Sequence, residues 1–368
     1  MAKRTKKISK KTISVIAVLI IVIFIGVGLA TGLISLDDIR SWLEPEETPI
    51  NTPKEFSGVE LVIGDELSGP VLDIHFIDVG QGDAIYIEFP DGKCMIIDGG
   101  DRNNTVSTAL LAYLDAQNPN VIDYLLLTHT DSDHVGSLDI VLENYEVKRI
   151  FMPDIIASYG MEDIEEPNNI DTLQYKQFVE AANTETYSEG DGEFDAEITL
   201  NVDIITIEED LYTMTIYCPE EEFYANFNNK SAAYKNNASP IIVIEYGGRT
   251  VILTGDADED AEQRFVEQSV NAIDADVLKV AHHGGAESSN EFFLEHTDPE
   301  YAVISCGEGN SYNHPRQAAI DRLQDIGVEY LFRTDLHSDI LLSIDGNGNM
   351  VFSLTENATQ TAAFTGFE

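Results

Sequence analysis

The sequence has few cysteines and few basic residues. Its three cysteines, Cys94, Cys218 and Cys306, stand singly, and no C-x-x-C pair occurs. This pattern argues against a disulfide framework and against a cysteine zinc site, and it predicts three buried thiols. The 21 lysines and arginines face 66 acidic residues, so the formal net charge is −45. A broad nucleic-acid-binding face is therefore not expected, because non-specific affinity for DNA comes mainly from Lys and Arg on phosphates.

The few basic residues are also unevenly placed. Six of the 21 lie before residue 12, and the uncharged, mostly apolar stretch 13–35 follows them. About 20 apolar residues span a bilayer as a helix. The basic segment 1–12 should stay in the cytoplasm, which predicts a single-pass transmembrane anchor at the cell membrane with an extracytoplasmic domain. A cleaved signal peptide is the alternative, although its apolar region is usually only about 7–15 residues long.

Three further segments are expected beyond the anchor. Residues 36–70 contain four prolines among many acids and are predicted to form an acidic linker. Strands and helices then alternate over residues 71–356, which predicts one α/β domain. The Thr/Ala-rich residues 357–368 are predicted to be a flexible tail.

Hydrophobic periodicity gives more detailed expectations inside the domain. Residues 173–182 have helical spacing, whereas 197–207 and 213–217 read as short strands. Residues 240–257 predict a hairpin that turns at Gly247-Gly248. The segment from His129 to His134 is expected to be a tight loop, because a buried strand precedes it and Gly136 follows.

Several apolar strands are followed by histidine and aspartate. Imidazole and carboxylate together suit zinc, and also manganese or iron. A carboxylate such as Asp256 can bridge two metals. Five of the eight histidines lie in these clusters, and His75, His296 and His337 are expected to be ordinary residues. The candidate metal ligands are His129, Asp131, Asp133, His134, Asp256, His282 and His283, with Asp98 and His314 as further polar groups at strand ends.

The order of these motifs resembles a known family. HFIDVGQGDA, MIIDGG, LTHTDSDHVGSL, LTGDA, LKVAHHGG and NHP followed by RTD run from His75 to Asp335. Together they resemble the metallo-β-lactamase superfamily, specifically the soluble domain of ComEC-type competence proteins. The resemblance implies an αββα sandwich, here preceded by the single transmembrane helix, with two divalent metals at one edge of the sheets.

The same resemblance implies a role for each matching residue. His129 and Asp131 should face one metal, and Asp133 and His134 the other. Asp256 should bridge them, either His282 or His283 should complete the set, and Asp98 should support the ligands from outside.

The sequence also departs from the family in two places. A ligand expected shortly before the strand leading to Asp256 is missing, and Asn236 or Asn237 falls near that place. The site on the His129 side is therefore expected either to bind its metal loosely or to recruit one of the two adjacent histidines, His282 and His283. In addition, a single helix replaces the multi-helix membrane channel to which ComEC-type domains are usually attached.

These observations predict a metal-dependent hydrolase of phosphodiesters. A pair of metals would activate water for attack on the phosphorus. Asp133 would bind metal and orient the nucleophile, and His314 would bind a phosphate oxygen or protonate the leaving group. The resemblance implies single-stranded DNA as substrate. The alternatives are a phosphodiesterase of the cell envelope, acting on teichoic acid or its phosphocholine, and a non-catalytic module that binds nucleic acid or a partner protein.

Overall fold

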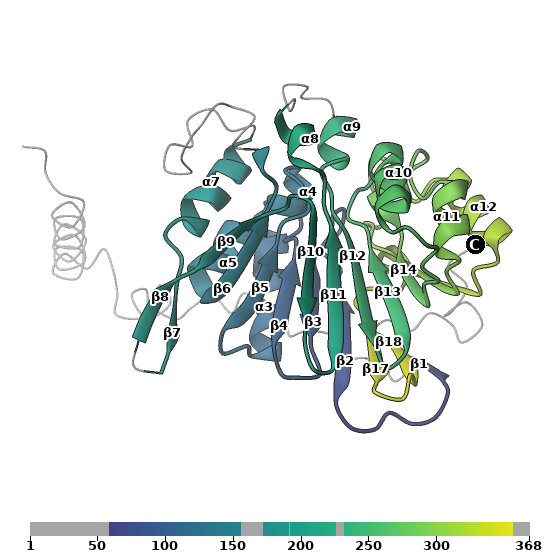
Figure 1. The fold of residues 1–368 in the computed structure, drawn as a ribbon, viewed down its shortest axis with the longest axis horizontal. Helices are drawn as coiled ribbons and strands as arrows, with labels where there is room; N and C mark the ends of the chain where they lie inside the picture. The colour runs from purple at the N-terminus through teal and green to yellow at the C-terminus, as the bar shows by residue number, and fades with distance from the viewer. Residues whose placement is uncertain (1–58, 156–171, 191, 226–231, 356–368) are drawn as a thin grey trace, which may run out of the picture. The chain divides into compact units, whose positions relative to one another are not determined.

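Two large β-sheets lie at the centre of the described part of the chain (Figure 1). The computed structural model describes residues 59–155, 172–190, 192–225 and 232–355. The predicted basic segment 1–12, anchor 13–35 and tail 357–368 lie outside the described residues. Within the described ranges, no helix combines the length and the apolar character needed to cross a bilayer.

The first sheet has nine strands, and its order mixes the two ends of the domain. In sheet order they are β1 (Val59–Ile63), β18 (Met350–Leu354), β17 (Ile340–Asp345), β2 (Val71–Phe76), β3 (Ile85–Glu88), β4 (Cys94–Ile97), β5 (Ile122–Leu126), β6 (Val147–Met152) and β9 (Glu197–Leu200). Strands β4, β5, β6 and β9 run parallel to one another, and the other pairs, including β3 with β4, are antiparallel.

The second sheet has seven strands in chain order. They are β10 (Ile204–Glu208), β11 (Tyr212–Tyr217), β12 (Ile241–Tyr246), β13 (Arg249–Leu253), β14 (Val277–Lys279), β15 (Tyr301–Ile304) and β16 (Tyr330–Arg333). Strands β13 to β16 are parallel to one another. A separate small hairpin pairs β7 (Thr186–Glu189) with β8 (Gly192–Asp195).

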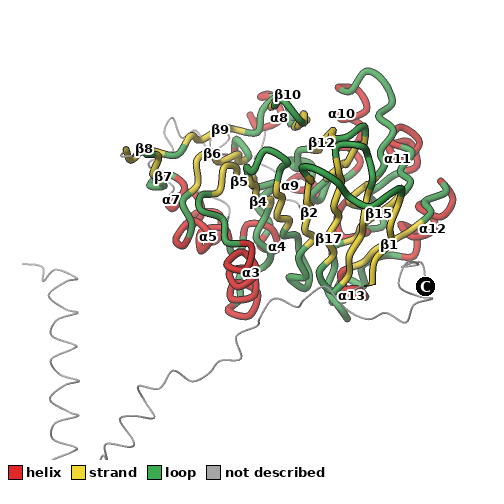
Figure 2. Tube along the Cα trace, turned by 90° about the horizontal axis from the view of Figure 1, so that it is seen from below, coloured by secondary structure: helices red, strands yellow, loops and turns green. Residues whose placement is uncertain are grey.

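Helices cover the outer faces of both sheets, so the layers follow the expected αββα order (Figure 2). One apolar cluster contains residues of both sheets and fills the space between them. A second joins the nine-stranded sheet to α3 (Asn104–Gln117), α5 (Leu138–Asn144) and α7 (Leu173–Ala182). A third joins the seven-stranded sheet to α10 (Glu259–Gln268), α11 (Glu291–Thr297) and α12 (Gln317–Ile326). The predicted α/β class and αββα layer order are confirmed.

Two predicted boundaries are wrong. The domain was expected to begin at Val71, after a linker, but Val59–Ile63 already forms β1 and pairs with β18. Residues 197–207 do not form one strand, because Asp203 has a φ of 60° and ends the extended run. Strand β9 therefore stays in the first sheet, whereas β10 begins the second. The chain thus passes from one sheet to the other at this break.

Other expectations from the sequence agree with the structure. The helix at 173–182, the hairpin turn at Gly247-Gly248 and the three buried thiols are all confirmed. His75, His296 and His337 each have a hydrogen-bond partner of their own, as ordinary residues do.

The parallel strands of both sheets end toward the same region. Asp98 follows β4, and Asp256 follows β13. Short helical segments then begin near these ends: α4 (Ser132–Val135) after β5, and the 3₁₀ turn η1 (Ala281–Gly284) after β14. Polar side chains at the carboxyl ends of parallel strands are held rigidly by the sheet, which suits a functional site.

Candidate metal centre

The carboxylate of Asp256 lies at the centre of four histidines. Its Oδ1 is 3.2 Å from His134 Nε2 and 3.3 Å from His283 Nε2. Its Oδ2 is 3.9 Å from His129 Nε2 and 3.8 Å from His282 Nε2. Each oxygen therefore faces its own pair of imidazoles, which is the arrangement a bridging carboxylate needs.

The other ring nitrogen of each histidine is engaged away from this centre. His134 Nδ1 is 2.7 Å from Asp98 Oδ2, and His283 Nδ1 is 2.8 Å from the carbonyl oxygen of Ser305. His282 Nδ1 is 3.1 Å from Asp258 Oδ1. Histidines that bind metals usually donate their second ring N–H to such acceptors, which fixes the tautomer. The lone pair on Nε2 is then free to bind a cation.

The spacing of these atoms fits a divalent cation. Bonds of about 2.0–2.1 Å from zinc to nitrogen or oxygen place neighbouring ligand atoms of a tetrahedron about 3.3 Å apart. Asp133 Oδ2 is 3.5 Å from His283 Nε2, and Asp131 Oδ2 is 3.9 Å from His129 Nε2. Buried polar atoms without a hydrogen-bond partner include the Nε2 atoms of His129, His134 and His283 and the Oδ1 of Asp256. A bound cation would satisfy these atoms.

Charge is concentrated here as well. Burial lowers the pKa of His134 and of His283, but attraction to Asp256 and other carboxylates outweighs it and holds both pKa values well above the usual range. Burial raises the pKa of Asp256, and the two imidazoles outweigh it and hold that pKa well below the usual range. A cluster that retains protons this strongly also attracts a divalent cation, which would displace them.

The segment from His129 to His134 is not the loop that was expected. Ser132 to Val135 form one helical turn, in which the N–H groups of His134 and Val135 bond to the carbonyl oxygen of Asp131. Gly136, which follows this turn, also has helical backbone angles and does not reverse the chain. It separates Asp131, which caps the turn, from Asp133 and His134 within it.

The pair His282-His283 adopts an unusual backbone. Their φ angles are 50° and 55°, in the left-handed region that non-glycine residues rarely occupy. This conformation costs on the order of 1 kcal/mol or more per residue and is found mainly at functional sites. It lets two adjacent histidines reach different oxygens of Asp256. Both histidines therefore face Asp256, and which of them completes a ligand set stays a prediction.

The segment without the expected ligand surrounds the His129 side of the centre. Lys235 Nζ is 3.0 Å from Asp131 Oδ1, and Asn236 Nδ2 donates to Asp258 at 3.1 Å. The Ser239 hydroxyl lies 3.4 Å from His129 Nδ1. Asn237 instead bonds to residues of α10. None of these contacts replaces the missing ligand, and His282 occupies the fourth position around Asp256.

A buried ion pair near the centre was not predicted. Lys279 Nζ is 2.5 Å from Asp83 Oδ2, and both side chains are almost fully buried. Asp83 Oδ1 is also 3.3 Å from His283 Nδ1. This carboxylate is paired with an ammonium, and its Oδ1 lies on the Nδ1 side of the His283 ring, whereas Nε2 of that ring faces Asp256. Lys279 interrupts the apolar run Val277–Ala281, and a charge in a buried strand is the signal that could have revealed it.

His314 lies beside the centre and not within it. Its ring centroid is 5.4 Å from that of His282 and 6.1 Å from that of His283. Gly284 permits this approach, since a Cβ there would lie 2.6 Å from the Cβ of Pro315. The exposed ring of Tyr312 stacks on His314 at 5.7 Å. The predicted contact of His314 with the substrate stays a prediction.

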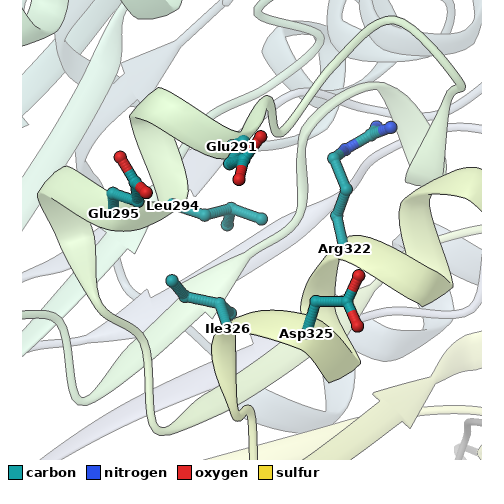
Figure 3. A pocket seen from close by; sticks show the side chains of 6 residues that line it. All are labelled: Glu291, Leu294, Glu295, Arg322, Asp325 and Ile326. Carbon is teal, nitrogen blue, oxygen red and sulfur yellow. The ribbon is translucent and has the colours of Figure 1, made fainter.

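A hollow of about 220 Å³ lies elsewhere, between α11 and α12 (Figure 3). Three carboxylates and Arg322 line it, together with two apolar residues. The guanidinium of Arg322 is already bonded to backbone carbonyls, including that of Ser289. None of the predicted site residues lines this hollow, so it gives no alternative to the centre around Asp256.

Comparison with known proteins agrees with the fold and the motifs. A family model described as the metallo-beta-lactamase superfamily matches residues 77–212. The chain is 31% identical over 283 residues to ComE operon protein 3 of Bacillus subtilis, covering 73% of this chain and 32% of that protein. It is 28% identical over 261 residues to Recombination protein 2 of Haemophilus influenzae, covering 70% of this chain and 27% of that protein.

The chain thus spans about a third of the length of these relatives, or less. Among solved structures it is similar to the metallo-beta-lactamase fold protein YhfI from Bacillus subtilis. That match has a TM-score of 0.43 and 13% identity, and it covers 74% of this chain and 99% of the other.

Proposed function

Because this chain belongs to the metallo-β-lactamase superfamily and resembles competence proteins, we propose that it is a metal-dependent hydrolase of phosphodiesters. The observation that carries the proposal is the position of Asp256, whose two oxygens face separate pairs of histidines. Zinc is the proposed metal, with manganese or iron as alternatives, because the ligands are imidazoles and carboxylates.

Each residue has a definite part in this proposal. His134, His283 and Asp133 would hold one metal, His129, Asp131 and His282 the other, and Asp256 would join them. Bound metals would supply Lewis acidity and activate water for in-line attack. Asp133, whose side chain is 25% exposed, can also accept a hydrogen bond from the attacking water.

His314 would bind a phosphate oxygen. Burial and the neighbouring His283 and His282 lower its pKa to about 4, so its imidazole is neutral at pH 7. A neutral ring donates one N–H to an oxygen, but it is a poor source of a proton for the leaving group. Of the two roles considered for His314, binding is therefore the better supported.

Single-stranded DNA is the first substrate to test. The net charge of −45 favours a second candidate, a small or cell-envelope phosphodiester, because an acidic surface repels a long polyanion. The proposed location is outside the cell membrane, with residues 13–35 as the anchor and the N-terminus in the cytoplasm.

The test uses the full-length protein, a chelator and two variants. Hydrolysis of single-stranded DNA, a small phosphodiester and wall polymer is compared with and without chelator, and the bound metal is measured. Asp133→Asn should abolish hydrolysis. The control Asp139→Asn changes a buried carboxylate that is paired with Arg102, and it should keep activity.

The outcomes separate the candidates. DNA hydrolysis that disappears at moderate salt, or that never occurs while the small diester is cleaved, favours the envelope substrate. Fewer than one tightly bound metal per chain, together with unchanged behaviour of Asp133→Asn, would favour a non-catalytic binding module and reject the hydrolase.

A further inference from the structure

Lys235 places a positive charge beside only one half of the centre. It lies in α9 (Ala232–Asn236), and its Nζ is 3.0 Å from Oδ1 of Asp131. Its side chain is only 13% exposed, so solvent screens this charge less than it would screen one at the surface. Figure 1 shows α9 and α4 at the same end of the two sheets.

The other half of the centre has no matching cation among the contacts of its ligands in the described residues. Asp133 and Asp256 face His134 and His283 there. The ammonium of Lys279 is paired with Asp83, on the far side of the His283 ring. Asp256 faces both sides, so the two sides differ in their second carboxylate: the charge of Asp131 is offset by Lys235, whereas Asp133 contacts no ammonium or guanidinium group within the described residues.

The two halves also differ in how closely their ligand atoms are assembled. Asp133, His134 and His283 form a group whose ligand atoms all lie within 4.8 Å of one another. His129 joins a similar group with His134 and Asp256. In the described ranges of the chain, no such group contains Asp131 or His282. These two side chains would have to close around a cation, which adds an ordering cost to the His129 side.

We propose that Lys235 makes the two metal sites unequal. The first metal binds tightly between Asp133, His134, His283 and Asp256. The second binds more weakly, by about tenfold or more, because it must enter beside a fixed ammonium. This inference rests on the proposed metal centre. It adds the order in which the two metals bind and the cause of that order.

A second role for Lys235 predicts the opposite result. If the ammonium only orients Asp131, as Asp98 orients His134, removing it would weaken the second site. If its charge opposes the second metal, removing it strengthens that site. The sign of the change therefore decides between an electrostatic and an orienting role.

Metal titration measures this sign without relying on activity. The metal-free, full-length protein is titrated with Zn²⁺ or Mn²⁺ by calorimetry and by competition with a chromophoric chelator. The parent should show two steps. Lys235→Met, which keeps a similar length and a good helix former, should tighten the second step about tenfold and leave the first unchanged. Lys235→Arg, which keeps the charge, should retain the weak second step.

Lys176→Met is the matched control, because Lys176 lies on α7, its side chain is 34% exposed, and it pairs with Glu180 at 3.9 Å. It should change neither step. Two equal steps in the parent, or a weaker second step in Lys235→Met, would overturn the inference and leave the proposed hydrolase intact. Absence of any metal binding in proteins shown to be folded by circular dichroism would instead overturn the metal centre itself, and this inference with it.

Discussion

Replacing Asp98 with asparagine should damage the metal centre without removing a ligand. Asp98 is fully buried and accepts three hydrogen bonds. They come from the backbone N–H of Thr128 at 2.8 Å, from its hydroxyl at 2.6 Å and from His134 Nδ1 at 2.7 Å. The carboxylate can accept all three, but an amide has only one oxygen.

The two orientations of the new amide have different costs. With its NH₂ toward the Thr128 backbone N–H, two donors meet and neither can change. With its NH₂ toward His134, the ring can respond by moving its hydrogen from Nδ1 to Nε2. The second orientation is cheaper, and it places a hydrogen on the atom that faces Asp256. His134 then no longer offers a lone pair to a cation.

The expected loss is one correctly oriented ligand. Changing the outer partner of a metal-binding histidine typically costs about 10- to 100-fold in metal affinity, or about 1.4–2.8 kcal/mol. Competition with a chromophoric chelator measures the affinity, and thermal unfolding checks that Asp98→Asn is folded. Asp139→Asn is again the control, because its carboxylate pairs with Arg102 and not with a histidine. A folded Asp98→Asn protein with parental metal affinity would refute the role of Asp98 and the tautomer assigned to His134.

Three other predictions concern different parts of the domain. Burial lowers the pKa of His75 to about 4, so the unfolded chain binds this proton first and the free energy of unfolding falls as the pH drops from about 6.5 to 4. In urea unfolding compared at pH 7 and pH 4, the decrease should be smaller by about 3 kcal/mol in His75→Gln than in the parent. Lys279→Met should leave the buried carboxylate of Asp83 unpaired and cost about 3–5 kcal/mol in urea unfolding, whereas the double change with Asp83→Leu should recover much of that loss. Tyr312→Ala should weaken binding of a single-stranded oligonucleotide to inactive Asp133→Asn protein about tenfold in fluorescence anisotropy. If base stacking is responsible, Tyr312→Phe, which keeps the ring, should retain binding, and an abasic oligonucleotide should bind equally well with and without the ring.

The sequence was sufficient to predict which side chains meet. His129, Asp256 and His283 are far apart along the chain, but each follows an apolar strand. Parallel strands of one sheet end at a common edge, and two sheets packed face to face bring their edges together. Periodicity placed these residues at strand ends, and the family resemblance, which implies two packed sheets, placed them in one region. Their binding of metal stays a prediction.

Other features of the fold have too weak a sequence pattern to be predicted. Strand β1 alternates over only five residues and lies within an acidic, proline-containing segment, so the strand signal was outweighed by composition. Its partner β18 is far away in sequence, and β1 pairs with it along its whole length while Leu61 and Ile63 pack against the core. The break between β9 and β10 depends on the left-handed backbone of Asp203. Because aspartate adopts that conformation in only a small fraction of cases, its presence in the sequence does not predict the break.

The His129 side of the centre shows why motif order predicts candidate ligands but not the balance of charge around them. A strand end fixes where a carboxylate or an imidazole lies, so a missing ligand in one segment can be replaced by His282 from another, provided the backbone turns left-handed there. The strand ends do not fix the net charge at the site, because that charge also depends on which long side chain reaches the site from elsewhere. Lys235 does so from a segment that, by sequence, showed only an absence. A centre with the expected number of ligands can thus hold its two metals with unequal strength, and only contacts between distant residues reveal the difference.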